Sequence, residues 1–215
     1  MTQERLARIV RFFLHWHYDI RLTRSEVLYK SSPVLILPNH TAYIDPIILF
    51  SELYDLPVSP MVDERFMRNP WMGRILSIAK AVEVPDLAHS AMTREEGAAQ
   101  AGRLTEIARE ALANGRSMVI YPSGHIKTVD KEIIGNRRLA YELCQALPAH
   151  TRVILCHMRG LESSRWSKLK PKKWLWRREV VLDFEDRTEE LQRKAQTMSR
   201  REFNEYLENW YNSHH

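Results

Sequence analysis

The chain has 215 residues, of which 44% are hydrophobic and 27% charged, and its formal net charge is +5. These proportions are typical of a globular domain with a substantial core, and they exclude a disordered chain and an integral membrane protein. No apolar run reaches the roughly 18 residues of a membrane span. The modest positive charge suits an anionic partner, which is a membrane surface, a phosphorylated ligand or a nucleic acid.

The chain contains two cysteines, Cys144 and Cys156, without a C-x-x-C spacing. This count argues against a zinc site, and we expect reduced thiols in a cytosolic compartment.

Residues 3–18 have apolar side chains at helical spacing, which predicts an amphipathic helix. Phe13 lies on the apolar face, and the basic residues largely off it are Arg5, Arg8 and Arg11. Such a helix suits a membrane interface, and a helix that simply docks on the core is equally consistent with the pattern. We therefore expect residues 1–30 to form an N-terminal helical, membrane-contacting element and residues 31–215 to form an α/β domain.

The most informative stretch is PVLILPNHTAYIDPIIL, from Pro33 to Leu49. Its apolar run over residues 34–37 predicts a buried strand that Pro38 ends, and a helix is expected to begin near Pro46. Three polar residues, Asn39, His40 and Asp45, lie between the two elements. The ends of strands that lead into helices are where α/β folds place their sites.

His40 and Asp45 have the chemistry of a general base and its orienting partner. A neutral imidazole takes a proton from a hydroxyl near neutral pH, and a carboxylate fixes its tautomer and stabilises the imidazolium. The pair alone is weak evidence, because this spacing is common by chance, and its position after a buried strand strengthens the interpretation.

The pattern Asn39-His40-x-x-x-x-Asp45-Pro46 after an apolar strand resembles the signature of the glycerolipid and lysophospholipid acyltransferases. The resemblance implies that the His deprotonates an acceptor hydroxyl, that the Asp supports it, and that the hydroxyl attacks the thioester of acyl-CoA or acyl-carrier protein. It implies that Asn39 helps to shape the site and contacts substrate. It also implies an acyl donor, a lysophospholipid acceptor and a membrane surface as partners, with no metal, redox cofactor or nucleic acid.

Later segments resemble further blocks of the same family. Residues 63–73 are similar to its second block, and Pro85 and Asp86 stand where many members have an Arg for the acceptor phosphate. This departure argues against phosphatidic acid synthesis. In the third block, usually Phe-Pro-Glu-Gly-Thr-Arg, Ser123 replaces the Glu and Ile126 the Arg. The block is more similar to Pro-Glu-Gly-Arg-Ile-Thr, as in the acyltransferase portion of lysophosphatidylethanolamine acyltransferases that accompanies acyl-carrier-protein synthetase.

The loop over residues 123–127 is expected to contact the acceptor head group. A Gly after a strand lets backbone amides approach an anionic ligand, and Lys127 or His125 could supply charge there. For the loop taken alone, an ordinary turn closed by Pro and Gly is the favoured explanation. The substrate-binding residues that the resemblance implies, besides Asn39, are Ser123, Gly124, His125, Lys127, Asn136 and Arg137.

The remaining pattern alternates strands and helices. Strands are expected at 58–62, 81–84, 117–121, 152–158 and 179–184, and helices at 93–114, 139–147 and from 199 onward. With the resemblance, this order predicts one α/β domain with a mixed, mostly parallel sheet wrapped by helices.

Between residues 164 and 178 there are seven basic residues and no acid, with Trp166, Trp174 and Trp176 among them. This stretch suits a membrane-docking patch, a solvated face or, less well, single-stranded nucleic acid.

We therefore predict an acyltransferase, peripheral on the cytoplasmic face of the inner membrane, that acylates a lysophospholipid or related glycerolipid. Two alternatives remain open on the sequence. The altered third block suits a non-catalytic membrane-binding relative, and the Trp and basic stretch suits a nucleic-acid-binding domain.

Overall fold

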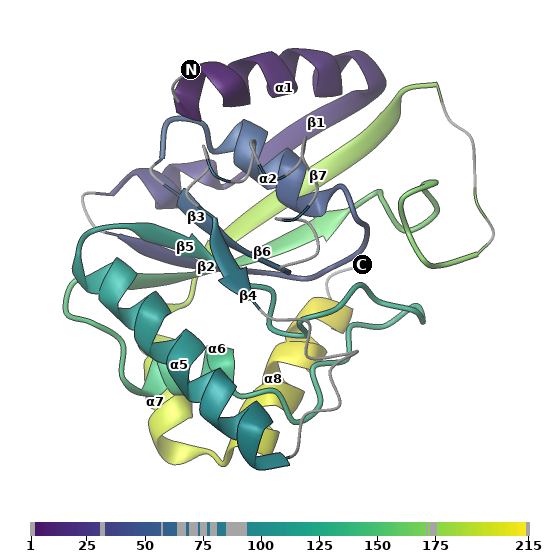
Figure 1. The fold of residues 1–215 in the computed structure, drawn as a ribbon. Helices are drawn as coiled ribbons and strands as arrows, with labels where there is room; N and C mark the ends of the chain where they lie inside the picture. The colour runs from purple at the N-terminus through teal and green to yellow at the C-terminus, as the bar shows by residue number, and fades with distance from the viewer. Residues whose placement is uncertain are drawn as a thin grey trace.

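A seven-stranded sheet in the order β1-β7-β6-β2-β5-β3-β4 organises the part of the chain that is described (Figure 1). The computed structural model describes residues 3–30, 33–56, 58–63, 68, 73, 77, 81–84, 94–170, 172 and 176–213. Its strands are β1 (Tyr18–Thr23), β2 (Val34–Pro38), β3 (Val58–Asp63), β4 (Val82–Val84), β5 (Ser117–Val119), β6 (Arg152–Arg159) and β7 (Arg178–Asp186). Neighbouring strands are parallel except for the antiparallel pair β6 and β7. The predicted mixed, mostly parallel sheet is confirmed.

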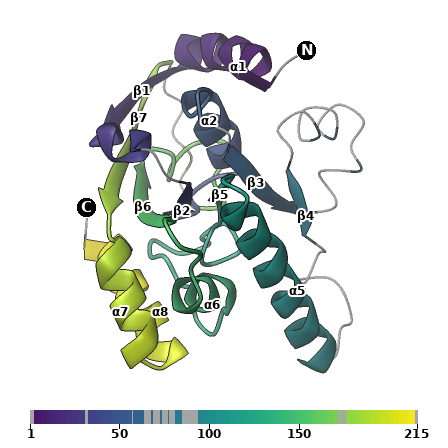
Figure 2. The same cartoon turned by 90° about the vertical axis from the view of Figure 1, so that its left-hand side faces the viewer.

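Helices cover both faces of the sheet (Figures 1 and 2). On one face lie α1 (Gln3–His17) and α2 (Asp45–Glu52), and on the other lie α5 (Arg94–Ala113), α6 (Leu139–Gln145), α7 (Thr188–Thr197) and α8 (Arg200–Ser213). A short 3-10 helix, η1 (Ser25–Tyr29), follows β1. None of the helices within the described ranges is long and apolar enough to cross a membrane.

Strand β2 lies at the centre of the sheet and divides the core. Val34 and Ile36 pack into the cluster under α1 and α2, and Leu35 and Leu37 pack into the cluster under α5 to α8. A strand buried on both faces needs a continuous apolar run, which is why its sequence does not alternate. Each such side chain contributes about 1.5–3 kcal/mol through burial.

The N-terminal segment differs from its prediction. Residues 1–30 were expected to be helical, but α1 ends at His17 and β1 forms an edge strand in parallel with β7. Ile20 and Leu22 alternate with polar neighbours and pair with Val180 and Leu182, a pattern that suits a half-buried strand. An all-helical segment is therefore wrong for residues 18–23.

Helix α8 begins where a helix was expected from residue 199, and a capping box closes its start. The Ser199 amide donates to Glu202 Oε2 at 2.8 Å, and the Glu202 amide donates to Ser199 Oγ at 3.4 Å.

Parts of the sequence predictions lie outside the described residues. These are Thr93, at the expected start of the 93–114 helix, Pro85 and Asp86, and all of the second block except residues 63, 68 and 73.

Candidate active site

The site forms where β2, β5 and β6 end. Because these strands are parallel neighbours, their carboxyl ends meet at one edge of the sheet. The Asn39 amide donates to the Cys156 carbonyl at 3.3 Å, and the Lys127 amide donates to the His40 carbonyl at 2.9 Å. The loop after β2 is thereby joined to the elements on both sides.

His40 and Asp45 are brought together as predicted from their spacing. Nδ1 of His40 lies 3.0 Å from Oδ2 of Asp45, the first residue of α2. The fully buried carboxylate also accepts hydrogen bonds from the Thr41 amide at 2.6 Å, the Ala42 amide at 2.9 Å and the Thr41 hydroxyl at 3.1 Å. These donors and the positive end of α2 satisfy the buried charge.

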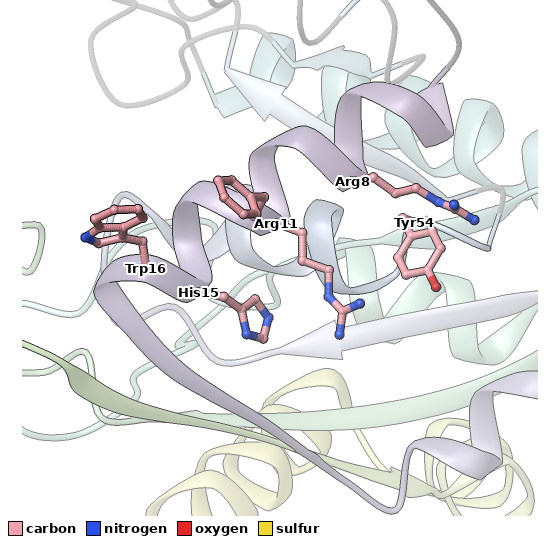
Figure 3. Close-up of a pocket in the computed structure, with 6 residues that line it drawn as sticks. Arg8, Arg11, His15, Trp16 and Tyr54 are labelled. Carbon is pink, nitrogen blue, oxygen red and sulfur yellow. The ribbon is translucent and has the colours of Figure 1, made fainter.

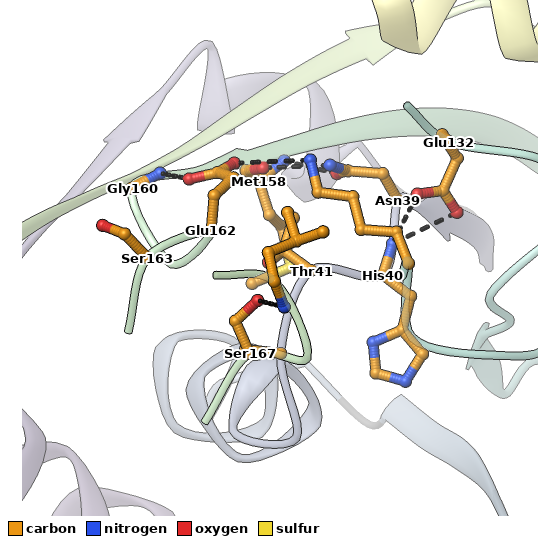
Figure 4. A network of polar contacts seen from close by, with 12 residues as sticks. Asn39, His40, Thr41, Glu132, Met158, Gly160, Glu162, Ser163 and Ser167 are labelled. Atoms are coloured by element: carbon orange, nitrogen blue, oxygen red, sulfur yellow. Dashed lines mark hydrogen bonds and ion pairs between the residues drawn. The ribbon is translucent and has the colours of Figure 1, made fainter. Parts of the chain in front are cut away.

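The contact with Asp45 determines which ring nitrogen of His40 is open. With Nδ1 directed at the carboxylate, Nε2 has no hydrogen bond to any group in the described ranges, and the side chain is 14% exposed. The Tyr121 ring stacks on the imidazole with centroids 4.1 Å apart and planes 25° apart. Figure 4 shows the imidazole turned away from the polar network around Asn39 and Glu132. A ring held in this way is able to accept a proton at Nε2.

Tyr121 is a residue that the sequence reasoning did not place in the site. Its hydroxyl is buried without a hydrogen-bond partner within the described ranges. Burial raises its pKa well above 10, and the nearby Asp45 charge raises it further. Tyr121 therefore supplies a neutral ring surface to His40.

Asn39 joins two strands at the site. Its Nδ2 donates to the Met158 carbonyl at 3.0 Å, and the Met158 amide donates to its Oδ1 at 2.7 Å. Both ends of the buried amide are thus occupied by β6. This geometry agrees with a role in shaping the site, whereas substrate contact by Asn39 stays a prediction.

The loop after β5 places its predicted residues in different settings. Ser123 is buried, and its hydroxyl donates to the His125 carbonyl at 3.1 Å. Exposed His125 donates from Nδ1 to the Ser123 carbonyl at 2.7 Å. Gly124 is exposed with φ +64°, a left-handed conformation that favours glycine. The nearly buried Lys127 lies with Nζ 3.8 Å from Glu162 Oε1.

Arg137 is close to this loop, and Asn136 is turned to another element. A Cβ on Gly124 would lie 3.9 Å from Arg137 Nε. Asn136 Oδ1 accepts hydrogen bonds from Arg200 Nε at 3.0 Å and Nη2 at 2.7 Å, which ties it to α8.

The predicted membrane residues of α1 lie on the surface. Phe12, Phe13 and Trp16 are 66%, 61% and 61% exposed, whereas Leu6, Ala7 and Leu14 are buried. A surface pocket of about 650 Å³ adjoins them, and Figure 3 shows the side chains around it. It is lined by Arg8, Arg11, Phe12, His15, Trp16 and Tyr54.

The second predicted membrane stretch runs beside the His40–Asp45 loop. The Tyr43 amide donates to the Trp166 carbonyl at 3.1 Å, and Ala42 forms a β-bridge with Ser167. Trp176 is 73% exposed, and Trp174 lies outside the described residues. The basic stretch is not uniformly on the surface, because Arg178 is buried and bonds the Gly160 carbonyl.

Comparison with known proteins agrees with this geometry. A family model described as Acyltransferase matches residues 19–161. The crystal structure of the 1-acyl-sn-glycerophosphate (LPA) acyltransferase PlsC from Thermotoga maritima is similar with a TM-score of 0.61 and 14% identity. The match covers 95% of this chain and 81% of that chain, and it confirms the fold. No curated protein matches the sequence significantly. Because the family model covers more than half of the sequence, and because the Asn39 to Asp45 pattern is built into a site, this chain belongs to the acyltransferase family.

Proposed function

We propose that this enzyme moves a fatty acyl group from a thioester, acyl-CoA or acyl-carrier protein, to a free hydroxyl of a lysophospholipid or related glycerolipid. The observation that supports this most directly is the contact of His40 with Asp45 at 3.0 Å, which leaves Nε2 open at the carboxyl edge of the sheet. The arrangement contains a base and its orienting acid, so the attacking group is the hydroxyl of the acceptor itself.

The proposed reaction begins when Nε2 of His40 takes the proton of the acceptor hydroxyl. The hydroxyl oxygen attacks the thioester carbonyl carbon, and Asp45 stabilises the imidazolium that forms. The carbon–sulfur bond then breaks, and the imidazolium returns its proton to the leaving thiolate. The products are the acylated lipid and a free thiol. A positioned general base of this kind contributes about 10²–10⁴-fold to the rate.

The acceptor head group would bind over the loop after β5. Exposed Gly124 presents its main chain there, His125 is also exposed, and the Arg137 guanidinium lies beside Gly124. A planar guanidinium suits a phosphate group. Lys127, although paired with Glu162, adds positive charge at the same edge. Ser123 braces the loop from within through the His125 carbonyl, and Asn136 is instead tied to Arg200 on α8.

We further propose that the enzyme works as a peripheral protein on the cytoplasmic face of the inner membrane. The exposed aromatic residues of α1 suit the interface, and Arg5, Arg8 and Arg11 suit anionic head groups. Two exposed tryptophans also suit the interface: Trp166, whose carbonyl binds the Tyr43 amide of the active-site loop, and Trp176.

The test is acyl transfer from labelled acyl-CoA and acyl-carrier protein to a panel of lysophospholipids. The native chain should transfer label, and His40→Ala should reduce turnover by at least about 10³-fold. The matched control is His150→Asn. This exposed histidine has φ +63°, a conformation that Asn also adopts, and the variant should keep native turnover.

Two results would count against the proposal in different ways. Unchanged turnover in His40→Ala would remove His40 from the reaction. No transfer by the native chain to any lysophospholipid would remove this acceptor class.

A further inference from the structure

Glu132 is a buried acid that the mechanism above does not use. It lies in the loop between β5 and α6 and is 3% exposed. The His40 amide donates toward its carboxylate, with both oxygens 3.4 Å away, and Figure 4 shows this contact. Burial raises the pKa of this carboxyl, and the nearby Ser123 side chain opposes that effect. Glu132 therefore contacts the strand end that presents the base, and it lies in the same β5–α6 loop as the residues expected to bind the acceptor.

The loop that carries Glu132 is held by α8. The Glu132 amide donates to Asn212 Oδ1 at 2.8 Å, and Asn212 Nδ2 donates to the Glu132 carbonyl at 3.0 Å. The Ile134 and Gly135 amides donate to Glu208 Oε1 at 2.6 and 2.7 Å. A main chain held in this way fixes where the Glu132 side chain starts, and the contact of its carboxylate with the His40 amide sets where it ends.

The surroundings of Glu132 raise the pKa of its carboxyl. Burial raises this pKa, and its neighbours oppose the rise without cancelling it. These neighbours are the Ser123 side chain, the His40 amide and the charges of His40 and Lys127. Tyr211 is the further titratable group near it. His40 is thus approached by two carboxylates, Asp45 at its ring and Glu132 at its main chain.

We propose that Glu132 is a positioning residue, whose carboxylate ties the main chain of His40 to the loop between β5 and α6, the loop that also contains Ser123–Lys127. This tie holds the base and the acceptor loop in one arrangement, and its effect on turnover rests on the proposed function. The tie itself does not rest on that function, so it is tested separately.

The first arm follows the His40 amide by ¹H–¹⁵N NMR between pH 4 and 8. Its chemical shift should show an inflection at a pH above about 4.3, the ordinary pKa of a glutamate, because burial raises the pKa of the Glu132 carboxyl. Glu132→Gln should abolish this inflection, and Glu132→Ala should speed hydrogen exchange of the Gly124 and Lys127 amides by about tenfold. Glu190→Gln, which removes a carboxylate from the α7 ion pairs, is the matched control and should change neither.

The second arm measures kinetics on variants whose circular dichroism is native. In Glu132→Gln, one oxygen can still accept from the His40 amide, but the side-chain NH₂ replaces the other acceptor. The value of kcat should therefore fall about tenfold in Glu132→Gln and further in Glu132→Ala. A pH profile of the His40 amide that is the same in Glu132→Gln as in the native chain overturns the proposal, as does native kcat in both variants. A native chain that transfers no acyl group would contradict the proposed function alone, because the NMR arm still decides the role of Glu132.

Discussion

At the scale of single residues, Asp45 does more than orient His40. Its carboxylate accepts hydrogen bonds from the Thr41 and Ala42 amides and from the Thr41 hydroxyl, so it also determines the shape of the loop between β2 and α2. An amide in its place would accept at one atom only and would turn an NH₂ toward donors. Loss of the carboxylate should therefore affect both the reaction and the fold.

We expect Asp45→Asn to lower kcat by about 10³-fold and the free energy of unfolding by about 1–3 kcal/mol. The measurements are acyl transfer and urea unfolding. Asp130→Asn, in an exposed loop, is the control and should leave both unchanged. Native kcat in Asp45→Asn would show that this carboxylate does not orient the base.

The sequence predicted a contact between site residues that are close in the chain and missed contacts between residues that are distant in it. His40 and Asp45 are five residues apart, and both follow a recognisable strand, so their contact followed from local pattern. Glu132 is 92 residues from His40 and lies in a loop without periodicity, so its approach depends on tertiary packing. The same limit explains Asn39, whose partner Met158 is 119 residues away.

At the scale of elements, the turn after β6 depends on one glycine. Gly160 has φ +96°, and a Cβ there would lie 2.1 Å from the Glu179 carbonyl oxygen on β7. Both the backbone conformation and the space exclude a side chain. The substitution would push β6 and β7 apart beside the site.

Gly160→Ala should lower the free energy of unfolding by at least about 2 kcal/mol. Gly102→Ala is the matched control, because Gly102 lies inside α5 with nothing within 4 Å of an added Cβ. That variant should gain about 0.5–1 kcal/mol through helix propensity. Urea unfolding of the two proteins measures the difference, and equal stability would contradict the role of Gly160.

Among the elements, strand β2 was predictable and strand β1 was not. Residues 34–37 form an apolar run with a proline at its end, and the structure buries all of them. Residues 18–23 follow directly after a helix, and their strand exists through pairing with β7, about 160 residues later. Short edge strands of this kind are determined by their partner more than by their own propensity.

At the scale of the whole molecule, two aspartates tie the chain's beginning and middle to β7. Asp183 accepts hydrogen bonds from Thr23 and Arg24, and Asp186 accepts hydrogen bonds from Thr188 and Arg152. Burial alone would raise the pKa of each carboxyl, and these donors and charges outweigh it, so both pKa values are lowered.

A lowered folded pKa stabilises the fold above the ordinary value of about 3.9, and that stability is lost as pH falls through the lowered value. We therefore expect the free energy of unfolding contributed by these groups to be constant from pH 7 to about 5 and to fall below about pH 4. Asp183→Asn should flatten this fall, and Asp130→Asn should not. Urea unfolding at pH 2.5–7 checks this, and an unchanged slope in Asp183→Asn would refute it.

The exposed face of α1 is connected to the active site through neighbouring aromatic residues. Burial raises the pKa of Tyr18, directly after α1, and the nearby Trp166 side chain opposes that effect. The Trp166 carbonyl accepts from the Tyr43 amide in the His40–Asp45 loop. We therefore expect a bilayer that binds α1 to lie near the edge of the site. This arrangement would let an acceptor lipid reach His40 without leaving the membrane surface.

Replacing Phe12, Phe13 and Trp16 together by Ser should reduce binding to anionic vesicles at least about tenfold, because these side chains are already exposed and their loss removes apolar area from the interface. Stability should be unchanged. Ile107→Ser removes an exposed apolar side chain from α5 on the opposite face and should leave binding as it was. Vesicle sedimentation with circular dichroism makes the comparison. Native binding by the triple variant would place the membrane contact elsewhere, whereas lost binding with native turnover on dispersed lysolipid would assign α1 to the membrane and His40 to the chemistry.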